Sequence, residues 1–491
     1  MNTSLKRNIL IVLLLATALF FRLYAIGNTA EFLGDQGRDG LEVTTAIEDR
    51  KLFVTGPTVG AGYFTGPLYY YLIAPSYFLF PNSPIAPIVE MCVIGVAAVI
   101  LFLYVASQLF GFRVAYIISI LWAVSPLMLI QDRRLWNPTP IPFFVLLLIA
   151  SLLWVFKQKK YWGYLTAAFA VSALLQLHYV NTISIVFIVF VWIFAEMNQM
   201  KRKYTKKRYM WMLGAVLLFV ASIGPFLWYE SQHNFFDIAG SMSTFMHGQD
   251  QVFSKRVYIA ALGKVTASLW KYVSAINSQG VLLGIAVFVL VVNGIRRVFE
   301  TRVLVLWFCF GVSVLALYKD TIQPQYWYQL IPVVFLLFAG LLSGVHKRMV
   351  VIVSIVIAVL ASCISWTSIH PYKVDDPDLS RITAITQKMA SLTEGQSFAF
   401  TVMHSRSFND LHIQYFFKLY GIPAVSIEDT TNNRLFIICE NGCLEKPIEK
   451  KVSIMCGAEI CPLDKPDVDF SIWKYVKTEW VGTSAIYLYA R

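Results

Sequence analysis

The chain has 491 residues, of which 57% are hydrophobic and only 14% are charged, and its mean hydropathy is +0.61. A soluble globular protein carries about 25% charged residues, so this composition excludes a soluble enzyme and a disordered chain. The net charge of +12 does not indicate a nucleic-acid binder, because the basic residues of a membrane protein gather in its cytoplasmic loops. The composition predicts a polytopic membrane protein.

Apolar runs close to the roughly 20 residues that a spanning helix needs recur up to about residue 369. We predict about eleven transmembrane helices. They lie at residues 8–27, 84–107, 113–131, 141–156, 161–178, 182–198, 209–228, 279–296, 303–318, 327–345 and 349–369. The first is interpreted as an uncleaved helix, because no small-residue cleavage site follows it and Arg22 interrupts it. The segment 67–80 is short for a span and contains Pro75, so we expect it to be embedded from the outer face.

Loop charge predicts the orientation. With Lys6 and Arg7 in the cytoplasm, almost every dense basic cluster falls inside, including KRKYTKKR at 201–208, as the positive-inside rule requires. The predicted location is a bacterial cell membrane, with a cytoplasmic N-terminus and an extracytoplasmic C-terminal domain. A long first outer loop then covers residues 28–83, and its apolar spacing predicts a surface helix at 39–50.

The C-terminal part changes in character. Residues 1–369 form the predicted transmembrane domain, and residues 370–491 are predicted to form a small α/β domain. Strands are expected at 397–403, 423–427, 434–439 and 484–489, with a helix at 409–420. Asp375, Asp376 and Asp378 are interpreted as part of a solvated linker, with cation binding as the alternative.

Four cysteines lie in this outer domain: Cys439, Cys443, Cys456 and Cys461. They fit two disulfides, with three possible pairings, or a four-cysteine zinc site. An oxidising exterior favours disulfides, and both alternatives stay open at this point.

Polar residues that suit chemistry gather in the predicted outer loops. A carboxylate such as Asp35 can act as a general base for an acceptor hydroxyl. Guanidinium groups such as Arg38, Arg133 and Arg134 match phosphate oxygens. We expect the following residues to line the substrate site: Asp39, Tyr63, Asp132, Trp136, Asn137, His178, Tyr179, Tyr326 and Tyr328. With an apolar groove for a lipid tail, this set favours transfer from a lipid-linked phosphate.

Several motifs resemble one family. Gly34-Asp35-Gln36-Gly37-Arg38-Asp39, followed by Gly66-Pro67-Leu68-Tyr69-Tyr70-Tyr71-Leu72, resembles the first external loop of bacterial GT-C superfamily glycosyltransferases of the family 39 type. These enzymes are related to protein O-mannosyltransferases and aminoarabinose transferases. Arg134-Leu135-Trp136-Asn137-Pro138, Leu177-His178-Tyr179 and Gln325-Tyr326-Trp327-Tyr328-Gln329-Leu330-Ile331-Pro332 also recur in such sequences. The resemblance covers essentially the whole membrane part.

The resemblance implies a GT-C fold, a polyprenyl-phosphate sugar donor and an inverting reaction with Asp35 as the base. It implies that Arg38, Arg133 or Arg134 holds the departing phosphate. Where aminoarabinose transferases carry Glu-Lys, this sequence has Thr65-Gly66, which leaves the sugar open. No metal ligand and no cofactor are predicted, although a divalent metal is possible.

Each assignment has an alternative. Asp35 could simply cap a helix or pair with Arg38, and Arg133 and Arg134 could bind lipid headgroups at the interface. The aromatic residues could be membrane anchors, and His178 could be structural. The whole chain could instead be a transporter or flippase of lipid-linked sugars, or an assembly scaffold. The expected partners are the lipid-linked donor, membrane lipid and an unknown glycan, lipid or protein acceptor, without nucleic acid.

Overall fold

A computed structural model describes residues 3–59, 62–199, 206–247, 254–274, 276–296, 298–318, 321–344, 369–393, 395–407, 409–425, 432–446 and 472–491. The chain divides into two compact units. The membrane unit comprises Met1–Tyr24, Phe53–Leu72 and Val89–Pro371, and the C-terminal unit comprises Ala25–Leu52, Ile73–Ile88 and Tyr372–Arg491. The first outer loop therefore contributes residues to both units.

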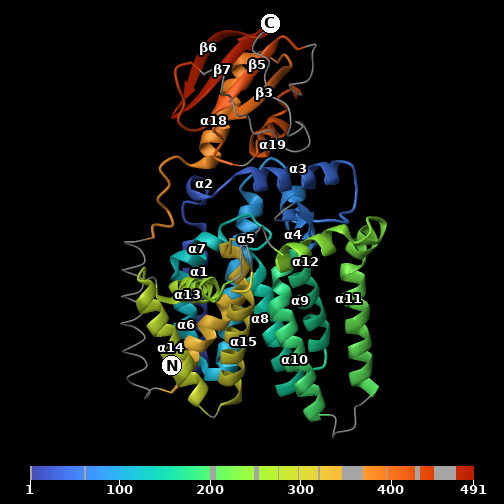
Figure 1. Cartoon of the computed structure of the whole chain (residues 1–491), viewed down its shortest axis with the longest axis vertical. Helices are drawn as coiled ribbons and strands as arrows, with labels where there is room; N and C mark the ends of the chain where they lie inside the picture. Colours follow the sequence, from blue (N-terminus) through green and yellow to red (C-terminus); the bar gives the residue numbers. More distant parts are fainter. Residues whose placement is uncertain are drawn as a thin grey trace. The chain divides into compact units, whose positions relative to one another are not determined.

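The membrane unit is mainly helical, and many of its helices run roughly parallel to one another (Figure 1). Its elements are α1 (Thr3–Leu23), β1 (Thr58–Val59), β2 (Tyr63–Phe64), α5 (Ala86–Phe110), α6 (Phe112–Val124), α7 (Pro126–Asp132), α8 (Ile141–Leu152), η1 (Leu153–Lys157), α9 (Gly163–Leu177), η2 (Tyr179–Asn181), α10 (Thr182–Gln199), α11 (Lys206–Gln232), α12 (Phe236–His247), α13 (Lys255–Ser274), α14 (Gln279–Ile295), α15 (Phe299–Leu315), η3 (Pro324–Leu330) and α16 (Ile331–Ser343). Within the described residues, five helices are long and apolar enough to cross a membrane, or up to seven if each bent pair is one span.

Each predicted span up to residue 345 coincides with one helix or a consecutive helix pair, which confirms the helical polytopic prediction. The span at 349–369 lies almost entirely outside the described residues. One pair, α6 and α7, bends by 65° at Pro126, whose missing N–H cannot continue the hydrogen-bond ladder. The helix α16 is apolar on all sides, and nearly all of its residues are buried, as expected for a helix inside a bundle.

The segment 229–278, expected to be an outer loop, instead contains the helices α12 and α13. The buried residues Val265, Leu269 and Tyr272 of α13 follow helical spacing. Lys264 and Lys271 interrupt the apolar run, so a search for long hydrophobic stretches misses this helix.

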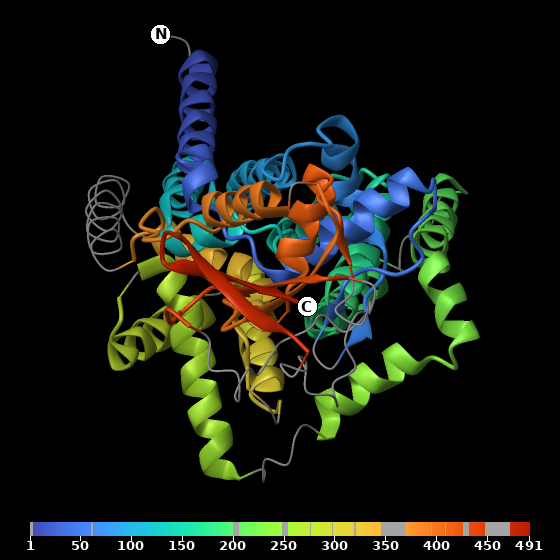
Figure 2. The same cartoon turned by 90° about the horizontal axis from the view of Figure 1, so that it is seen from above.

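The C-terminal unit contains a five-stranded sheet in the order β4-β3-β5-β7-β6. The strand β3 is parallel to β4 and β5, whereas β7 is antiparallel to β5 and β6. Its elements are α2 (Ile26–Thr29), α3 (Gly34–Glu48), the second half of α4 (Leu68–Leu79), α18 (Asp378–Thr393), β3 (Phe398–Met403), α19 (Leu411–Tyr420), β4 (Ala424–Val425), β5 (Arg434–Cys439), β6 (Lys474–Val481) and β7 (Ser484–Ala490). The helices α18 and α19 contact each other and cover one face of the sheet (Figure 2). The predicted strands and helix are present, which confirms the small α/β domain, and α18 and β6 were not predicted.

The helix α3 carries the Asp35 motif and packs against α19. A Cβ atom at Gly37 would lie 2.3 Å from the backbone nitrogen of His412, so only glycine allows the two helices to approach this closely. At the far end of α3, the Lys418 ammonium donates to Thr45 Oγ1 at 2.7 Å and pairs with Glu48 at 2.8 Å. The predicted surface helix at 39–50 thus begins earlier, at Gly34, and is part of the C-terminal unit.

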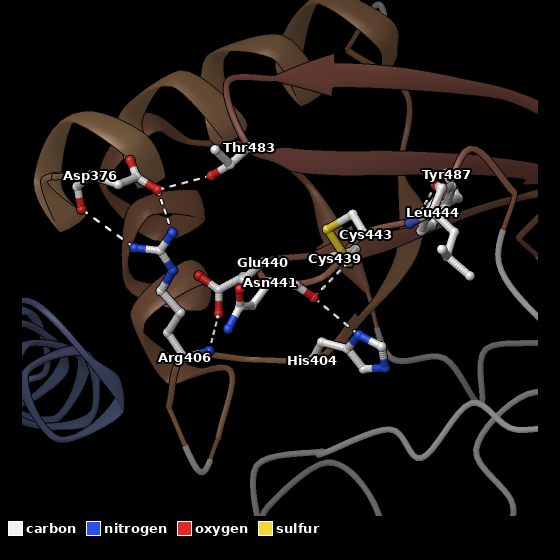
Figure 3. Close-up of a disulfide and its surroundings, with 10 residues drawn as sticks. All are labelled: Asp376, His404, Arg406, Cys439, Glu440, Asn441, Cys443, Leu444, Thr483 and Tyr487. Carbon is white, nitrogen blue, oxygen red and sulfur yellow. Dashed lines mark hydrogen bonds and ion pairs between the residues drawn. A yellow bond between two sulfur atoms is a disulfide. The ribbon is translucent and has the colours of Figure 1, made fainter.

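Charged residues near the start of α18 form an organised network (Figure 3). The interpretation of Asp376 and Asp378 as solvated linker residues is wrong, because Asp376 accepts a hydrogen bond from Arg406 at 2.5 Å and Asp378 accepts one from the Phe32 amide at 3.2 Å. Asp375 is exposed. Arg381 pairs with Asp378 from the next turn of α18, whereas Arg406 lies 30 positions from Asp376, so composition alone could not reveal this second pairing.

Glu440 lies at the centre of the C-terminal unit and is fully buried. Its carboxylate accepts hydrogen bonds from Ser405 at 2.9 Å and from the Arg406 amide at 3.1 Å, and it lies 3.1 Å from His412 Nε2 and 3.4 Å from Arg381. Glu440 therefore connects α18, α19 and the end of β5.

Cys439 and Cys443 form a disulfide next to this network (Figure 3). This bond agrees with the disulfide alternative for Cys439 and Cys443. Cys456 and Cys461 lie outside the described residues, so their state stays a prediction.

Candidate functional site

The membrane unit contains an apolar cavity of about 590 Å³. This volume lies in the range of about 300–1,000 Å³ typical of small-molecule pockets. The cavity is lined by Val59, Tyr63, Leu175, Gln176, His178, Tyr179, Val180, Thr182, Ile183, Val186, Ile223, Phe226, Ile238, Ser241, Met242, Thr244, Phe245, Phe310, Val314, Tyr318 and Tyr326. Apolar side chains dominate this lining and a few polar groups interrupt it, as is typical of small-molecule pockets.

The break between α9 and α10 brings His178 and Tyr179 to the cavity. Asn137 donates a hydrogen bond to the Leu177 carbonyl at 2.6 Å, and Asn181 donates one to the Leu174 carbonyl at 2.8 Å. The Leu177 carbonyl is one that the end of a helix leaves without an intrahelical partner, whereas the Leu174 carbonyl also accepts the His178 amide at 3.4 Å. His178 Nδ1 in turn accepts the Val180 amide at 3.3 Å. The local turn is thus specified by the predicted motif residues themselves.

Aromatic side chains continue this wall into η3. The ring of His178 lies 5.4 Å from the ring of Tyr326, which lies 5.4 Å from the ring of Tyr318. Tyr328, two residues further along η3, is buried and does not line the cavity. The structure therefore brings together four of the predicted lining residues: Tyr63, His178, Tyr179 and Tyr326.

The segment 132–137 places its charged residues at different depths. Asp132 is almost fully buried and pairs with the buried Arg22, with Oδ2 2.6 Å from Nη2. Arg133 is also buried and donates to the Tyr24 carbonyl at 3.1 Å. Arg134 is partly exposed, and its guanidinium lies 5.4 Å from the centre of the Trp136 ring. Of the two adjacent arginines, Arg134 is the more accessible to an external phosphate.

Asp35, Arg38 and Asp39 lie together in the first turns of α3, in the C-terminal unit. Arg38 pairs with Asp35 at 2.9 Å and with Asp39 at 2.9 Å. Asp39 is fully buried, whereas the Asp35 side chain keeps 23% of its surface exposed. Asp35 is therefore the more accessible carboxylate of the three-residue cluster, and Arg38 restricts its orientation.

Four residues that build these sites were not predicted: Arg22, Gln176, Glu230 and Asp237. Arg22 is noted in the sequence only as an interruption of the first helix, and Gln176 carries the same signal, because each is a polar residue inside an apolar helix, where such residues usually have a partner. Glu230 and Asp237 carry no comparable signal, since they lie among other polar residues of a segment interpreted as a loop. Among the described residues, no group of three or more His, Cys, Asp or Glu side chains is arranged to hold a metal ion.

No protein-family model matches the sequence, and the search of curated proteins finds no match. Solved structures do match. ArnT from Cupriavidus metallidurans bound to undecaprenyl phosphate superposes with a TM-score of 0.60 at 12% identity, over 88% of this chain and 93% of that chain. Its apo state gives a TM-score of 0.60 at 12% identity, over 90% and 94% of the two chains. The Archaeoglobus fulgidus oligosaccharyltransferase gives a TM-score of 0.47 at 12% identity, over 83% and 63%. The likeness to ArnT over nearly the whole chain confirms the GT-C fold that the sequence predicted.

Proposed function

We propose that this chain is a membrane glycosyltransferase that moves a sugar from a polyprenyl-phosphate donor to an acceptor hydroxyl at the outer face of a bacterial cell membrane. The observation that carries this proposal is the apolar cavity of about 590 Å³. Its lining suits an isoprenoid chain, because apolar surface removed from water drives lipid binding. The shared fold with ArnT, which has been solved bound to undecaprenyl phosphate, supports the same class of ligand here.

Arg134 is the residue that we favour for the donor phosphate. It belongs to the same unit as the cavity. Three residues further along the chain, Asn137 donates a hydrogen bond to the carbonyl of Leu177, which directly precedes the cavity-lining His178. Arg133 is buried and bonded to a backbone carbonyl, while Arg38 is shared between two carboxylates. A partly exposed guanidinium can form two parallel hydrogen bonds to phosphate oxygens.

Asp35 is the proposed base. It takes the proton of the acceptor hydroxyl, whose oxygen then attacks the anomeric carbon from the side opposite the phosphate. The bond between the anomeric carbon and the phosphate oxygen breaks, and polyprenyl phosphate leaves with its negative charge. The result is inversion at the anomeric carbon. The ion pair with Arg38 supports this role because it fixes the carboxylate in one orientation.

The first test is sugar transfer from a panel of polyprenyl-phosphate sugars by the purified wild type and Asp35→Asn. A positioned general base contributes about 10²- to 10⁴-fold, so we expect the variant to lose at least about two orders of magnitude in kcat. Asp49→Asn is a matched control, since Asp49 caps the other end of α3 and its exposed carboxylate pairs with Lys51 at 2.8 Å. Equal activity of Asp35→Asn and wild type would contradict the assignment.

Arg134→Ala tests the phosphate role separately. Loss of one charge-stabilising donor typically costs about 10²- to 10³-fold in kcat, so we expect a loss of that size, with partial recovery in Arg134→Lys. Binding of the lipid by the wild type without turnover of any donor would instead favour a transporter or a scaffold.

A further inference from the structure

We propose that the β1–β2 hairpin forms one wall of the donor-lipid pocket and that Asp237 holds this wall in place, which makes Asp237 a positioning residue for donor binding. The inference rests on the proposed function, in which the cavity takes the isoprenoid tail. The residues that carry it all belong to the membrane unit.

The hairpin is a very short ribbon. The strand β1 pairs with β2 through Thr58–Phe64 and Val59–Tyr63 only, and the Gly56 amide donates to the Thr65 carbonyl at 2.8 Å. An isolated two-stranded ribbon is at best marginally stable. Its position therefore depends on contacts with the rest of the unit.

Both backbone groups of Phe64 are bound by side chains from other elements. The Phe64 amide donates to Asp237 Oδ1 at 2.9 Å, and the Tyr179 hydroxyl donates to the Phe64 carbonyl. Just beyond the hairpin, the Leu68 amide donates to Gln176 Oε1 at 3.2 Å. Tyr179 and Gln176 themselves line the cavity, so the hairpin is attached to the cavity lining at several points.

Packing joins the hairpin to α12. A Cβ atom at Gly240 would lie 2.2 Å from the ring of Tyr63, and that ring lies 5.7 Å from the ring of Phe236. Val59 and Tyr63 of the hairpin line the cavity together with residues of α12, among them Met242. The hairpin and α12 thus form a continuous wall, and Gly240 is the point at which they meet most closely.

Asp237 is close to Glu230 of α11, and both residues are buried. Glu230 Oε2 also accepts the Ile238 amide at 3.2 Å, which fixes it to the first turn of α12. The bond from Phe64 to Asp237 therefore ends on the first turn of α12, which the Ile238–Glu230 bond joins to α11.

Loss of the Asp237–Phe64 bond would release the hairpin and remove Val59 and Tyr63 from contact with the lipid. The proposed base and phosphate-binding residues would be unaffected. We therefore expect weaker donor binding, seen as a higher KM, with little change in kcat. A hydrogen bond to a charged group typically corresponds to about a ten- to hundredfold change in an equilibrium constant, and we expect Kd to rise by this factor.

The test measures the Kd of undecaprenyl phosphate for the full-length protein in detergent, by tryptophan fluorescence, together with KM and kcat for the active donor. Asp237→Ala removes the acceptor, and we expect Kd and KM to rise with kcat within about twofold. Asp237→Asn keeps an oxygen for the Phe64 amide, so it should restore nearly normal binding. Gly240→Ala displaces the hairpin without removing a polar group, and we expect it to weaken binding as well.

Wild-type affinity in both Asp237→Ala and Gly240→Ala would overturn the inference, as would an equal loss in Asp237→Asn and Asp237→Ala. If Asp237→Ala does not fold, as judged by its Tm, Gly240→Ala and Asp237→Asn decide the question. Asp49→Ala serves as the control for removal of an exposed carboxylate. A wild type that binds no polyprenyl phosphate would refute the proposed function itself, which is a different outcome from a failure of the hairpin variants.

Discussion

The buried ion pair between Arg22 and Asp132 allows a sharp test of the structure. Asp132 Oδ2 accepts hydrogen bonds from Arg22 Nη2 at 2.6 Å and from Nε at 2.9 Å. Arg22 Nη1 also donates to the carbonyls of Ala18 and Ala123 at 3.2 and 3.1 Å. The pair thus joins α1 to the bent segment formed by α6 and α7. Because Arg22 is fully buried, it has no access to water if its partner is removed.

Removal of one partner from a buried pair typically costs about 3–5 kcal/mol, whereas replacement of both by apolar residues is often neutral. We therefore expect Asp132→Leu to lower the free energy of unfolding by about 3–5 kcal/mol. The double variant Arg22→Met/Asp132→Leu is expected to recover most of this loss. Asp132→Asn keeps an oxygen for the guanidinium and should lie between the wild type and Asp132→Leu.

The free energy of unfolding can be measured in mixed micelles by titration with sodium dodecyl sulfate, with tryptophan fluorescence as the signal. The wild type, Asp132→Leu, the single variant Arg22→Met and the double variant form a double-mutant cycle, which isolates the energy of the Arg22–Asp132 interaction. A cost below about 1 kcal/mol for Asp132→Leu, or additive losses in the double variant, would refute a buried ion pair of this strength. If Asp132→Asn has normal stability but no transfer activity, Asp132 contacts the substrate, as the sequence predicted.

Three further predictions concern the C-terminal unit. Burial opposes the ionisation of Glu440, but its hydrogen bonds and positive neighbours hold its pKa at about 2, below the ordinary value of 4.5. Its stabilisation is therefore present above about pH 4.5 and is lost as the pH falls toward 2. The free energy of unfolding of the C-terminal unit should therefore change by about 3 kcal/mol less between pH 4.5 and pH 2 in Glu440→Gln than in the wild type. Hydrogen exchange at the two pH values measures this difference. A Cβ atom at Gly37 would meet the backbone of His412 at 2.3 Å, so Gly37→Ala should destabilise the C-terminal unit by about 1–3 kcal/mol. Unchanged protection of α3 and α19 from hydrogen exchange in this variant would contradict the close packing of the two helices. The Cys439–Cys443 disulfide closes a loop with a sequence separation of 4, so its reduction should cost at most about 2 kcal/mol, and a larger loss of protection would mean that it constrains more than this loop.

Much of the helical part could be predicted, because a helix that spans a membrane can be recognised from its apolar composition. A spanning helix must satisfy its backbone groups internally and present apolar side chains to lipid, so helices such as α5 and α11 are visible as long apolar runs. The helix α13 was missed because its buried face is narrow and lysines interrupt it. The buried face of α13 packs against α14, α15 and α16, so its position depends on these contacts and not on a long apolar run of its own. Strands of the C-terminal sheet were found where burial makes them continuously apolar, as in β3 and β5. The strand β6 at the sheet edge has no buried residue and lacks that signal.

The candidate site shows a different limit. Motif residues such as Asn137 and His178 could be singled out because they lie in or beside short polar loops between apolar helices, and the structure gives both a local hydrogen-bonding role. The sequence could not distinguish Arg133 from Arg134, which are adjacent and chemically identical. One faces the protein interior and the other is partly exposed, and this difference depends on where α7 ends.

The contact between Asp237 and Phe64 is the clearest example of what a single sequence cannot show. The two residues are 173 positions apart, and neither lies in a recognisable motif. Their bond exists because η2, α11 and α12 converge on the same short hairpin, and that convergence is a property of the whole membrane unit. The resemblance to GT-C enzymes identified the residues proposed for chemistry, whereas the residues that shape the pocket come from loops with no motif. Donor preference in this chain is therefore expected to respond to substitutions in the hairpin and α12 at least as strongly as to those in the motif residues that line the same cavity.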